Sequence, residues 1–117
     1  MQIGELSEAV GLSLRTIRHY DDVGLLPASR TEGGYRVYSE SDLQRMLAIR
    51  TLKPLGFSLE EMRGILDAID ASQADPADGE ARRRLGEYTE QIAAKREQLL
   101  VNLDRATSLV TRLRELA

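Results

Sequence analysis

The sequence contains no cysteine and no tryptophan, and it has one histidine, His19, and one phenylalanine. Without cysteine, the chain has no disulfide, zinc-thiolate site, iron–sulfur cluster or thiol nucleophile, and one histidine cannot form a multi-histidine metal site. We therefore expect no cofactor and no metal. No apolar run approaches the roughly 18 residues of a membrane span, and the first residues do not resemble a signal peptide. We expect a cytoplasmic protein that contacts no membrane.

The groupings of side chains that enzymes use are also missing. The segment Glu32-Gly33-Gly34-Tyr35 is a turn, without the Lys-Ser/Thr that completes a phosphate-binding loop. The acidic pairs Asp21-Asp22 and Glu60-Glu61 are typical of a helix face and of a capping box. The sequence therefore predicts no catalytic activity.

The N-terminal half of the chain has no excess of positive or negative charge. The net charge is −3, and residues 1–54 hold seven basic and seven acidic residues. Residues 55–117 hold nine basic and twelve acidic residues. The overall charge does not by itself indicate nucleic-acid binding, so the positions of the basic residues must decide.

Two short helices are predicted at the N-terminal end. The first has apolar residues at helical spacing, namely Ile3, Leu6 and Val10, and Gly11 stops it. Ser13 is a good N-cap for the second, because its hydroxyl accepts an otherwise unpaired backbone N–H, and Gly24 ends that helix. Helices of these lengths joined at residues 11–13 have the proportions of a helix-turn-helix.

The second of these helices has two faces. Leu14 and Ile17 are expected to point inward. The opposite face carries polar residues at i, i+3, i+4 and i+7, namely Arg15, Arg18, His19 and Asp22.

A two-stranded hairpin is predicted next. Gly33-Gly34 forms a tight turn because glycine adopts positive φ without steric cost. Tyr35-Arg36-Val37-Tyr38 has strand composition, and Arg30 and Arg36 would lie near the tip. An isolated hairpin is marginally stable, so we expect it to pack on the helices.

Two more amphipathic helices follow, each opened by a capping box, at Ser39–Asp42 and at Ser58–Glu61. Pro54 and Gly56 end the first of them. Its predicted inner stripe is Leu43, Met46 and Leu47, and that of the second is Leu59, Met62, Ile65, Leu66 and Ile69.

A linker and one long helix complete the chain. Residues 71–79 contain Pro76, Gly79 and small or acidic residues, and a helix without proline is predicted from about Gly79 to Leu116. At ~1.5 Å per residue this helix is about 55 Å long. Its apolar residues follow a heptad pattern, which predicts a coiled coil that needs a partner: Leu85, Tyr88, Ile92, Leu99, Leu103, Ala106, Leu109, Val110, Leu113 and Leu116. Lys95, Arg96 and Asn102 interrupt it. The alternative is that this apolar stripe folds back onto the two preceding helices.

Several segments, in order, resemble the DNA-binding domain of the MerR family over about residues 1–70. They are Thr16-Ile17-Arg18-His19-Tyr20-Asp21-Asp22-Val23-Gly24-Leu25-Leu26, then Arg30, Gly34-Tyr35-Arg36-Val37-Tyr38, Asp42-Leu43 and Leu55-Gly56-Phe57-Ser58-Leu59-Glu60-Glu61. The long helix lies where that family has its dimerisation helix.

The resemblance implies a mainly α fold: a winged helix-turn-helix with four helices and a β-hairpin wing, then a long coiled-coil dimerisation helix. We expect a DNA-binding domain at 1–72, a linker at 73–79 and an antiparallel dimerisation helix at 80–117. The resemblance also implies a bacterial transcription regulator that binds a pseudopalindromic promoter operator as a homodimer and distorts the spacer DNA. RNA polymerase and a small organic effector are the further candidate partners.

His19-Tyr20-Asp21-Asp22 is similar to the antibiotic- and multidrug-responsive branch, since many other members have an aromatic residue at His19 and Glu at Asp21. Metal- and redox-sensing members use cysteines, which are missing here. Drug-responsive members usually add a ligand domain after the helix, so we expect either a minimal regulator or one whose C-terminal domain has been removed.

The predicted DNA contacts lie on the second helix and on the wing: Ser13, Arg15, Thr16, Arg18, His19, Tyr20, Arg30, Tyr35 and Arg36. Arg18 can hold guanine O6 and N7 or clamp a phosphate, and a surface ion pair with Asp22 is its alternative. Tyr20 can stack on a sugar or pack in the core. Arg30 and Arg36 suit backbone clamping by the wing, whereas Tyr38 is expected to pack.

Two alternatives stay open. Arg82-Arg83-Arg84, at the start of the long helix, is either a phosphate patch or, more commonly for such runs, a solvated face, and it opposes the helix dipole. The whole chain could also be a helical interaction adaptor that binds protein rather than DNA, which the balanced charge of residues 1–54 would suit.

Overall fold

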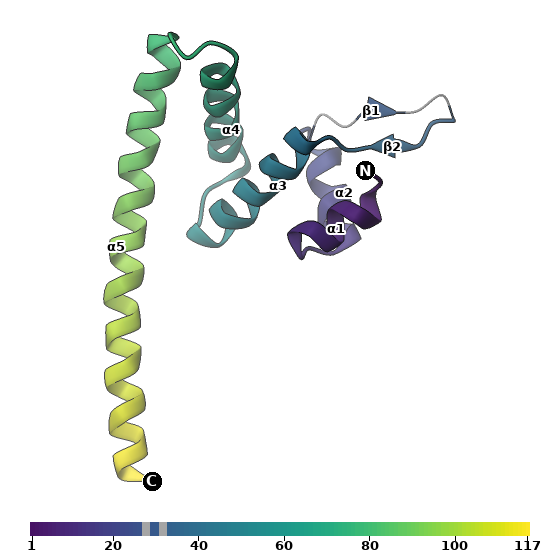
Figure 1. Cartoon of the computed structure of the whole chain (residues 1–117). Helices are drawn as coiled ribbons and strands as arrows, with labels where there is room; N and C mark the ends of the chain where they lie inside the picture. Colours follow the sequence, from purple (N-terminus) through teal and green to yellow (C-terminus); the bar gives the residue numbers. More distant parts are fainter. Residues whose placement is uncertain (27–28, 31–32) are drawn as a thin grey trace. The chain divides into compact units, whose positions relative to one another are not determined.

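The computed structural model describes residues 1–26, 29–30 and 33–117, with the backbone alone at 29–30. The chain divides into two compact units, Met1–Asp67 and Ala68–Ala117. Figure 1 shows the order of the elements.

The first unit begins with the predicted pair of short helices, α1 (Ile3–Val10) and α2 (Leu14–Asp22). α1 ends where Gly11 adopts a φ of 70° and donates its N–H to Ser7 O at 2.9 Å. The Ser13 Oγ begins α2 by accepting the N–H of Thr16 at 3.1 Å. The glycine stop and the serine cap are therefore confirmed.

The wing is a hairpin of β1 (Ser29–Arg30) and β2 (Arg36–Val37), in which Arg30 pairs with Arg36 in antiparallel register. Figure 1 shows it extending away from α1 and α2. Gly34 has a φ of 80°, as a tight turn requires. Residues 31–32 and the Arg30 side chain, on which part of the wing prediction rests, lie outside the described residues.

Tyr38 shows how the base of the wing is held. Its N–H donates to Met1 O at 2.7 Å, and the Met1 ammonium donates to Tyr38 O, also at 2.7 Å. The chain before α1 therefore pairs with the end of β2. This contact supports a hairpin too small to be stable alone.

α3 (Glu40–Leu52) begins with the predicted capping box. Ser39 N–H donates to Asp42 Oδ2 at 2.9 Å, and Asp42 N–H donates to Ser39 Oγ at 3.1 Å. A short 3₁₀ turn, η1 (Lys53–Leu55), follows, and Gly56 ends it with a φ of 91°. The predicted stop at Pro54 and Gly56 is confirmed.

α4 (Leu59–Ala74) opens on the second capping box, in which Ser58 N–H donates to Glu61 Oε1 at 3.0 Å and Glu61 N–H donates to Ser58 Oγ at 3.1 Å. The predicted inner residues Met62, Ile65 and Leu66 are buried. Leu59 and Ile69 are partly covered.

The core of the first unit is mostly aliphatic, as the scarcity of aromatic residues predicts. Its fully buried large side chains come from every helix of the unit and from the turns between them: Phe57, Leu6, Ile17, Leu25, Met46, Ile49, Met62, Leu66 and Val10. Burying each of these stabilises the fold by about 1.5–3 kcal/mol relative to leaving it in water.

Two predictions of inward-facing residues were wrong. Leu14 is 39% exposed, because it is the first residue of α2 and precedes the turn that packs inward. On α3, Leu43 and Leu47 are only half-buried. The buried face of α3 consists instead of Asp42, Arg45, Met46, Ile49 and Leu52. Arg45 can lie there because its Nε donates to Leu25 O at 2.9 Å.

Gly56→Ala should destabilise the first unit by about 1–2 kcal/mol, since an alanine at φ 91° adopts the left-handed region at a steric cost. A Cβ there would meet no atom within 4 Å, so backbone strain alone is tested. Gly4→Ala, in α1 and equally open, is the matched control. It should leave stability unchanged or raise it by up to about 1 kcal/mol. Equal midpoints of urea unfolding for the two variants would contradict this assignment.

The second unit contains α5 (Gly79–Leu116), whose 38 residues match the predicted range. Asp78 caps it by accepting the N–H of Ala81 at 3.1 Å. The linker was predicted too long, because α4 continues to Ala74 and the segment between the helices is 75–78. Across the described residues, no helix is long and apolar enough to cross a membrane.

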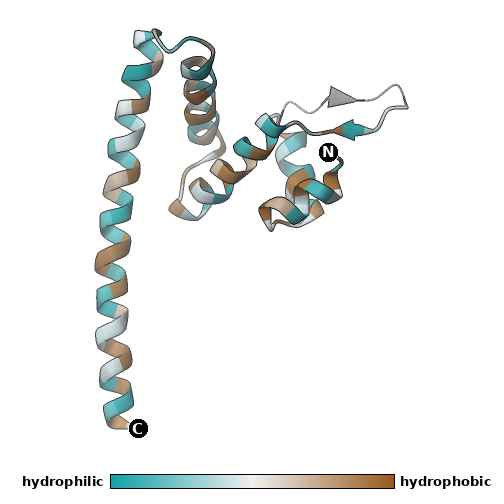
Figure 2. Cartoon of the chain, in the orientation of Figure 1, coloured by the Kyte–Doolittle hydropathy of each residue, from teal (hydrophilic) through white to brown (hydrophobic). Residues whose placement is uncertain are grey.

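Large apolar residues of α5 lie in water in the single chain, and Figure 2 shows them recurring toward its C-terminal end. From Leu99 onward they are between 43% and 72% exposed: Leu99, Leu100, Val101, Leu103, Leu109, Val110, Leu113 and Leu116. Ala106 is also exposed, whereas the predicted seam residues Leu85, Tyr88 and Ile92 are half-buried. Leu100 and Val101 were not part of the predicted seam.

Candidate nucleic-acid interface

The outward face of α2 has the predicted composition. Arg15, Arg18, His19 and Asp22 are all exposed, one helical turn after another. Within the described part of the chain, no ion pair joins Arg18 to Asp22, although a pair at i, i+4 was the alternative reading of Arg18. The Arg18 guanidinium is therefore available to an external acceptor.

The hydroxyls at the start of α2 are already engaged. Ser13 Oγ and Thr16 Oγ1 lie 2.9 Å apart in a hydrogen bond, and Ser13 Oγ also accepts the Thr16 N–H. The capping role predicted for Ser13 is confirmed, while a phosphate contact by either hydroxyl stays a prediction.

Tyr20 lies in the core. It is 5% exposed, and its ring centroid is 5.2 Å from that of the exposed His19. Of the two roles that the sequence allowed for Tyr20, the structure favours packing, because a ring this covered cannot stack on a sugar.

The base of the wing is tied to the end of α2 by a shared carboxylate. The Arg36 guanidinium pairs with Asp21 Oδ2, and Arg36 Nη1 lies 3.8 Å from Asp22 Oδ1. The Tyr38 hydroxyl donates to the same Asp21 oxygen at 2.9 Å. Tyr38 is 2% exposed, so its predicted packing role is confirmed.

The pKa values of these groups follow from the contacts. The hydrogen bond to Asp21 raises the pKa of the Arg36 guanidinium, which stays charged at any physiological pH. Burial raises the pKa of the Tyr38 hydroxyl, and the hydrogen bond to Asp21 raises it further. Tyr38 therefore remains a neutral donor to Asp21.

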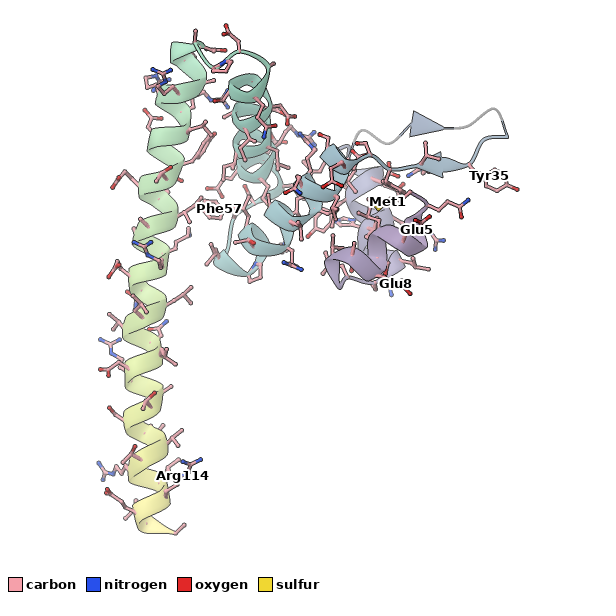
Figure 3. The ribbon with its side chains drawn as sticks, viewed as in Figure 1. Met1, Glu5, Glu8, Tyr35, Phe57 and Arg114 are labelled. Carbon is pink, nitrogen blue, oxygen red and sulfur yellow. The ribbon has the colours of Figure 1, made fainter. Side chains whose placement is uncertain are left out.

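Tyr35 behaves differently from the other tyrosines of this region. It is 72% exposed, and Figure 3 shows its side chain projecting from the hairpin away from α1. An aromatic ring exposed to this degree on the wing is compatible with the predicted DNA contact.

A cavity of about 380 Å³, open to solvent on one side, lies between α2 and the wing. Arg18 and Asp22 line it from α2, and Arg36 and Tyr35 line it from the wing. Gln2, at the N-terminal end of the chain, also lines it. Two guanidinium groups from different elements therefore share one concave surface, where they can bind a phosphate or a base edge.

Several arginines of the first unit serve the fold instead. Arg50 Nη1 donates to Val10 O, the end of α1, at 2.8 Å. Arg63 donates to Val23 O at 2.8 Å and to Gly24 O at 3.2 Å, after the end of α2. With the buried Arg45, these arginines satisfy backbone carbonyl groups at helix ends and in the turn after α2.

Sequence reasoning missed Gln2, which lines the cavity, and Asp21, which pairs with the cavity residue Arg36. Gln2 reaches the cavity because Met1 pairs with Tyr38, which is 37 positions away in the chain. Periodicity reports contacts within one helix or strand, so no local signal could have found either residue.

Two arginines of the basic run at the start of α5 have partners within the chain. Arg83 pairs with Glu80 and Glu87, and Arg82 Nη2 donates to Pro76 O at 2.8 Å. The hydrogen bond from Arg83 lowers the pKa of Glu80. Asp78 and Glu80, at the N-terminal end of the helix, offset the unfavourable effect of the arginines on its dipole.

No group of three or more potential metal ligands occurs in the part of the chain that the structure describes.

Two family models match the chain. One, described as MerR HTH family regulatory protein, matches residues 1–69, and the other, described as MerR, DNA binding, matches residues 43–116. Their ranges overlap from α3 through most of α4.

Curated relatives agree with this. The nodulation protein NolA of Bradyrhizobium elkanii is 51% identical over 67 residues, which cover 56% of this chain and 31% of that protein. The HTH-type transcriptional activator mta of Bacillus subtilis is 43% identical over 67 residues, which cover 56% of this chain and 26% of that protein. The N-terminal part of mta has been crystallised, and mta is described there as a multidrug transporter activator. The chain spans less than a third of the length of these relatives.

Solved structures share the fold. A transcriptional regulator of the MerR family from Bacillus thuringiensis superposes with a TM-score of 0.80 at 24% identity, covering 100% of this chain and 98% of that one. HiNmlR has a TM-score of 0.72 at 27% identity, covering 93% of this chain and 82% of that one. It is described as a regulator lacking the sensor domain, bound to promoter DNA. The predicted fold class is confirmed.

Proposed function

This chain belongs to the MerR family of helix-turn-helix transcription regulators, and we propose that it binds a pseudopalindromic promoter operator as a homodimer and distorts the spacer DNA. Members of this family bind DNA and regulate transcription, and they are not enzymes.

The observation that carries the proposal is the cavity between α2 and the wing, with Arg18 exposed on one wall and Arg36 on the other. The major groove of B-DNA is about 12 Å wide and admits one α-helix. If α2 lies there, Arg18 reaches base edges or phosphates, and the wing lies over the neighbouring backbone.

The dimer is proposed from α5. This helix is 38 residues long and exposes leucine and valine side chains from Leu99 to Leu116. Apolar residues that recur every seven positions on a helix are covered in a coiled coil by a partner helix. A second copy of α5 in antiparallel orientation would cover these residues and present two copies of α2 to two half-sites.

The finer regulatory steps belong to the same proposal. Distorting a spacer that is too long would let RNA polymerase engage both promoter elements, as the family resemblance implies. A small organic effector is proposed from the similarity to mta, which is described as a multidrug transporter activator.

Selection from a random duplex library tests the proposal. Purified dimer should enrich a pseudopalindrome whose half-sites lie one helical turn apart or slightly more. Binding should weaken steeply with salt, because each neutralised phosphate contributes about −0.9 to the slope of log affinity against log salt. If folded dimer enriches no sequence at low salt but retains a protein partner after nuclease treatment, the chain is an interaction adaptor instead.

A further inference from the structure

Asp21 lies next to the proposed DNA surface without being part of its exposed face. Its side chain is 10% exposed, whereas that of the neighbouring Asp22 is 69% exposed. One oxygen of Asp21 accepts hydrogen bonds from two wing residues, Arg36 and Tyr38, which are 15 and 17 positions away in the chain. The carboxylate thus joins the last turn of α2 to β2.

Arg36 keeps donors available in this arrangement. A guanidinium has five N–H donors, and the contacts of Arg36 with Asp21 and Asp22 both involve Nη1. The side chain is 31% exposed and lines the cavity opposite Arg18. A long side chain without such a partner would lose rotamer freedom on meeting a ligand, which weakens binding.

We propose that Asp21 is a positioning residue for DNA binding: it holds the Arg36 guanidinium, with Tyr38 holding Asp21 in turn, so that the remaining donors of Arg36 meet a backbone phosphate at the cavity beside Arg18. This inference rests on the proposed function, since it assigns a phosphate contact to the same interface.

A competing role for Asp21 makes the opposite prediction. If Asp21 only cancels the charge of Arg36, its removal frees a positive charge, and DNA binding becomes tighter with a steeper dependence on salt. If Asp21 positions Arg36, its removal loses an ordered phosphate contact, and binding becomes weaker with a shallower dependence on salt.

The test uses Asp21→Asn, with Asp22→Asn as the matched control. Both variants remove one negative charge from the end of α2, and Asp22 lies 3.8 Å from Arg36 without the close contact that Asp21 makes. Operator affinity is measured across a salt series by fluorescence anisotropy. We expect Asp21→Asn to weaken binding by about tenfold, the loss of one charge-assisted contact, and to reduce the salt slope by up to about 0.9. Asp22→Asn should tighten binding, because it removes a negative charge from the cavity wall without removing the close partner of Arg36.

Two further variants complete the design. Asp21→Glu keeps the charge and should retain affinity within about threefold, as a hydrogen-bonded carboxylate still reaches the guanidinium. In an Arg36→Ala background, Asp21→Asn should not lower operator affinity further, since the guanidinium that Asp21 positions is gone. Circular dichroism and thermal unfolding of each variant separate these effects from loss of fold.

The outcomes distinguish the inference from the proposed function. A parent protein that binds no operator contradicts the proposed function. If the parent binds the operator, but Asp21→Asn and Asp22→Asn both tighten binding or change it equally, the positioning role of Asp21 is wrong and the proposed function stands. An undiminished effect of Asp21→Asn in the Arg36→Ala background would also overturn it.

Discussion

Arg18→Ala should lower operator affinity by about 5- to 150-fold, which corresponds to about 1–3 kcal/mol, the usual value of a bidentate contact with a base. Arg18 is exposed on α2, lines the cavity shared with the wing and makes no ion pair with Asp22 within the described residues. Truncation therefore removes few contacts within the protein and should leave the unfolding temperature close to that of the parent.

Repeating the library selection with the variant identifies what Arg18 contacts. If it reads a guanine, one position of each half-site should lose its preference, whereas loss of a phosphate contact weakens all sequences equally. Arg114→Ala, which removes the same charge and side chain from the exposed end of α5, is the control and should bind as the parent does. An Arg18→Ala protein that binds its operator like the parent would show that α2 is not the recognition helix.

Leu103→Asp should convert the dimer to a monomer and lower operator affinity by more than about 100-fold. Leu103 is 63% exposed in the single chain and lies within the proposed seam of α5. Each substitution occurs twice in a homodimer, and an unpaired carboxylate buried in a seam costs several kcal/mol. A monomer engages one half-site at a time and loses the gain in effective concentration that links the two copies of α2.

Thr111→Asp is the matched control on the same helix. Thr111 is exposed, hydrogen-bonds Thr107 O through Oγ1 and lies at the heptad position farthest from the seam. It should remain dimeric and bind the operator as the parent does. Sedimentation equilibrium measures the state of both proteins. A dimeric Leu103→Asp protein would show that another surface holds the copies together, and the proposed seam would have to be abandoned.

Local chemistry in the sequence determined the secondary structure. Ser13, Ser39 and Ser58 each accept a backbone N–H from the residue three positions later, as their cap positions predict. The absence of proline from residues 79–116 and the sustained apolar pattern predicted the bounds of α5. These features depend on residues within one or two helical turns, so periodicity and capping chemistry describe them correctly.

The choice among chemically similar side chains needed the tertiary structure. Tyr20 and Tyr35 are equally plausible DNA contacts by residue type, yet Tyr20 is 5% exposed and Tyr35 is 72% exposed. Arg45 and Arg50 satisfy carbonyl groups, whereas Arg18 makes no such contact with the residues that the structure describes. Counting arginines in the sequence overestimates the basic surface for this reason.

The sequence by itself determined the class of the molecule: a helix-turn-helix with a wing, a long helix with an unpartnered apolar pattern, and a polar face on α2 that carries Arg18. Only the tertiary structure decided how the wing is joined to that face, through Asp21, Arg36 and Tyr38. Helix and strand periods report on neighbours a few positions apart, whereas these contacts join residues 15 and 17 positions apart from different elements. They exist only once both elements pack on the same core.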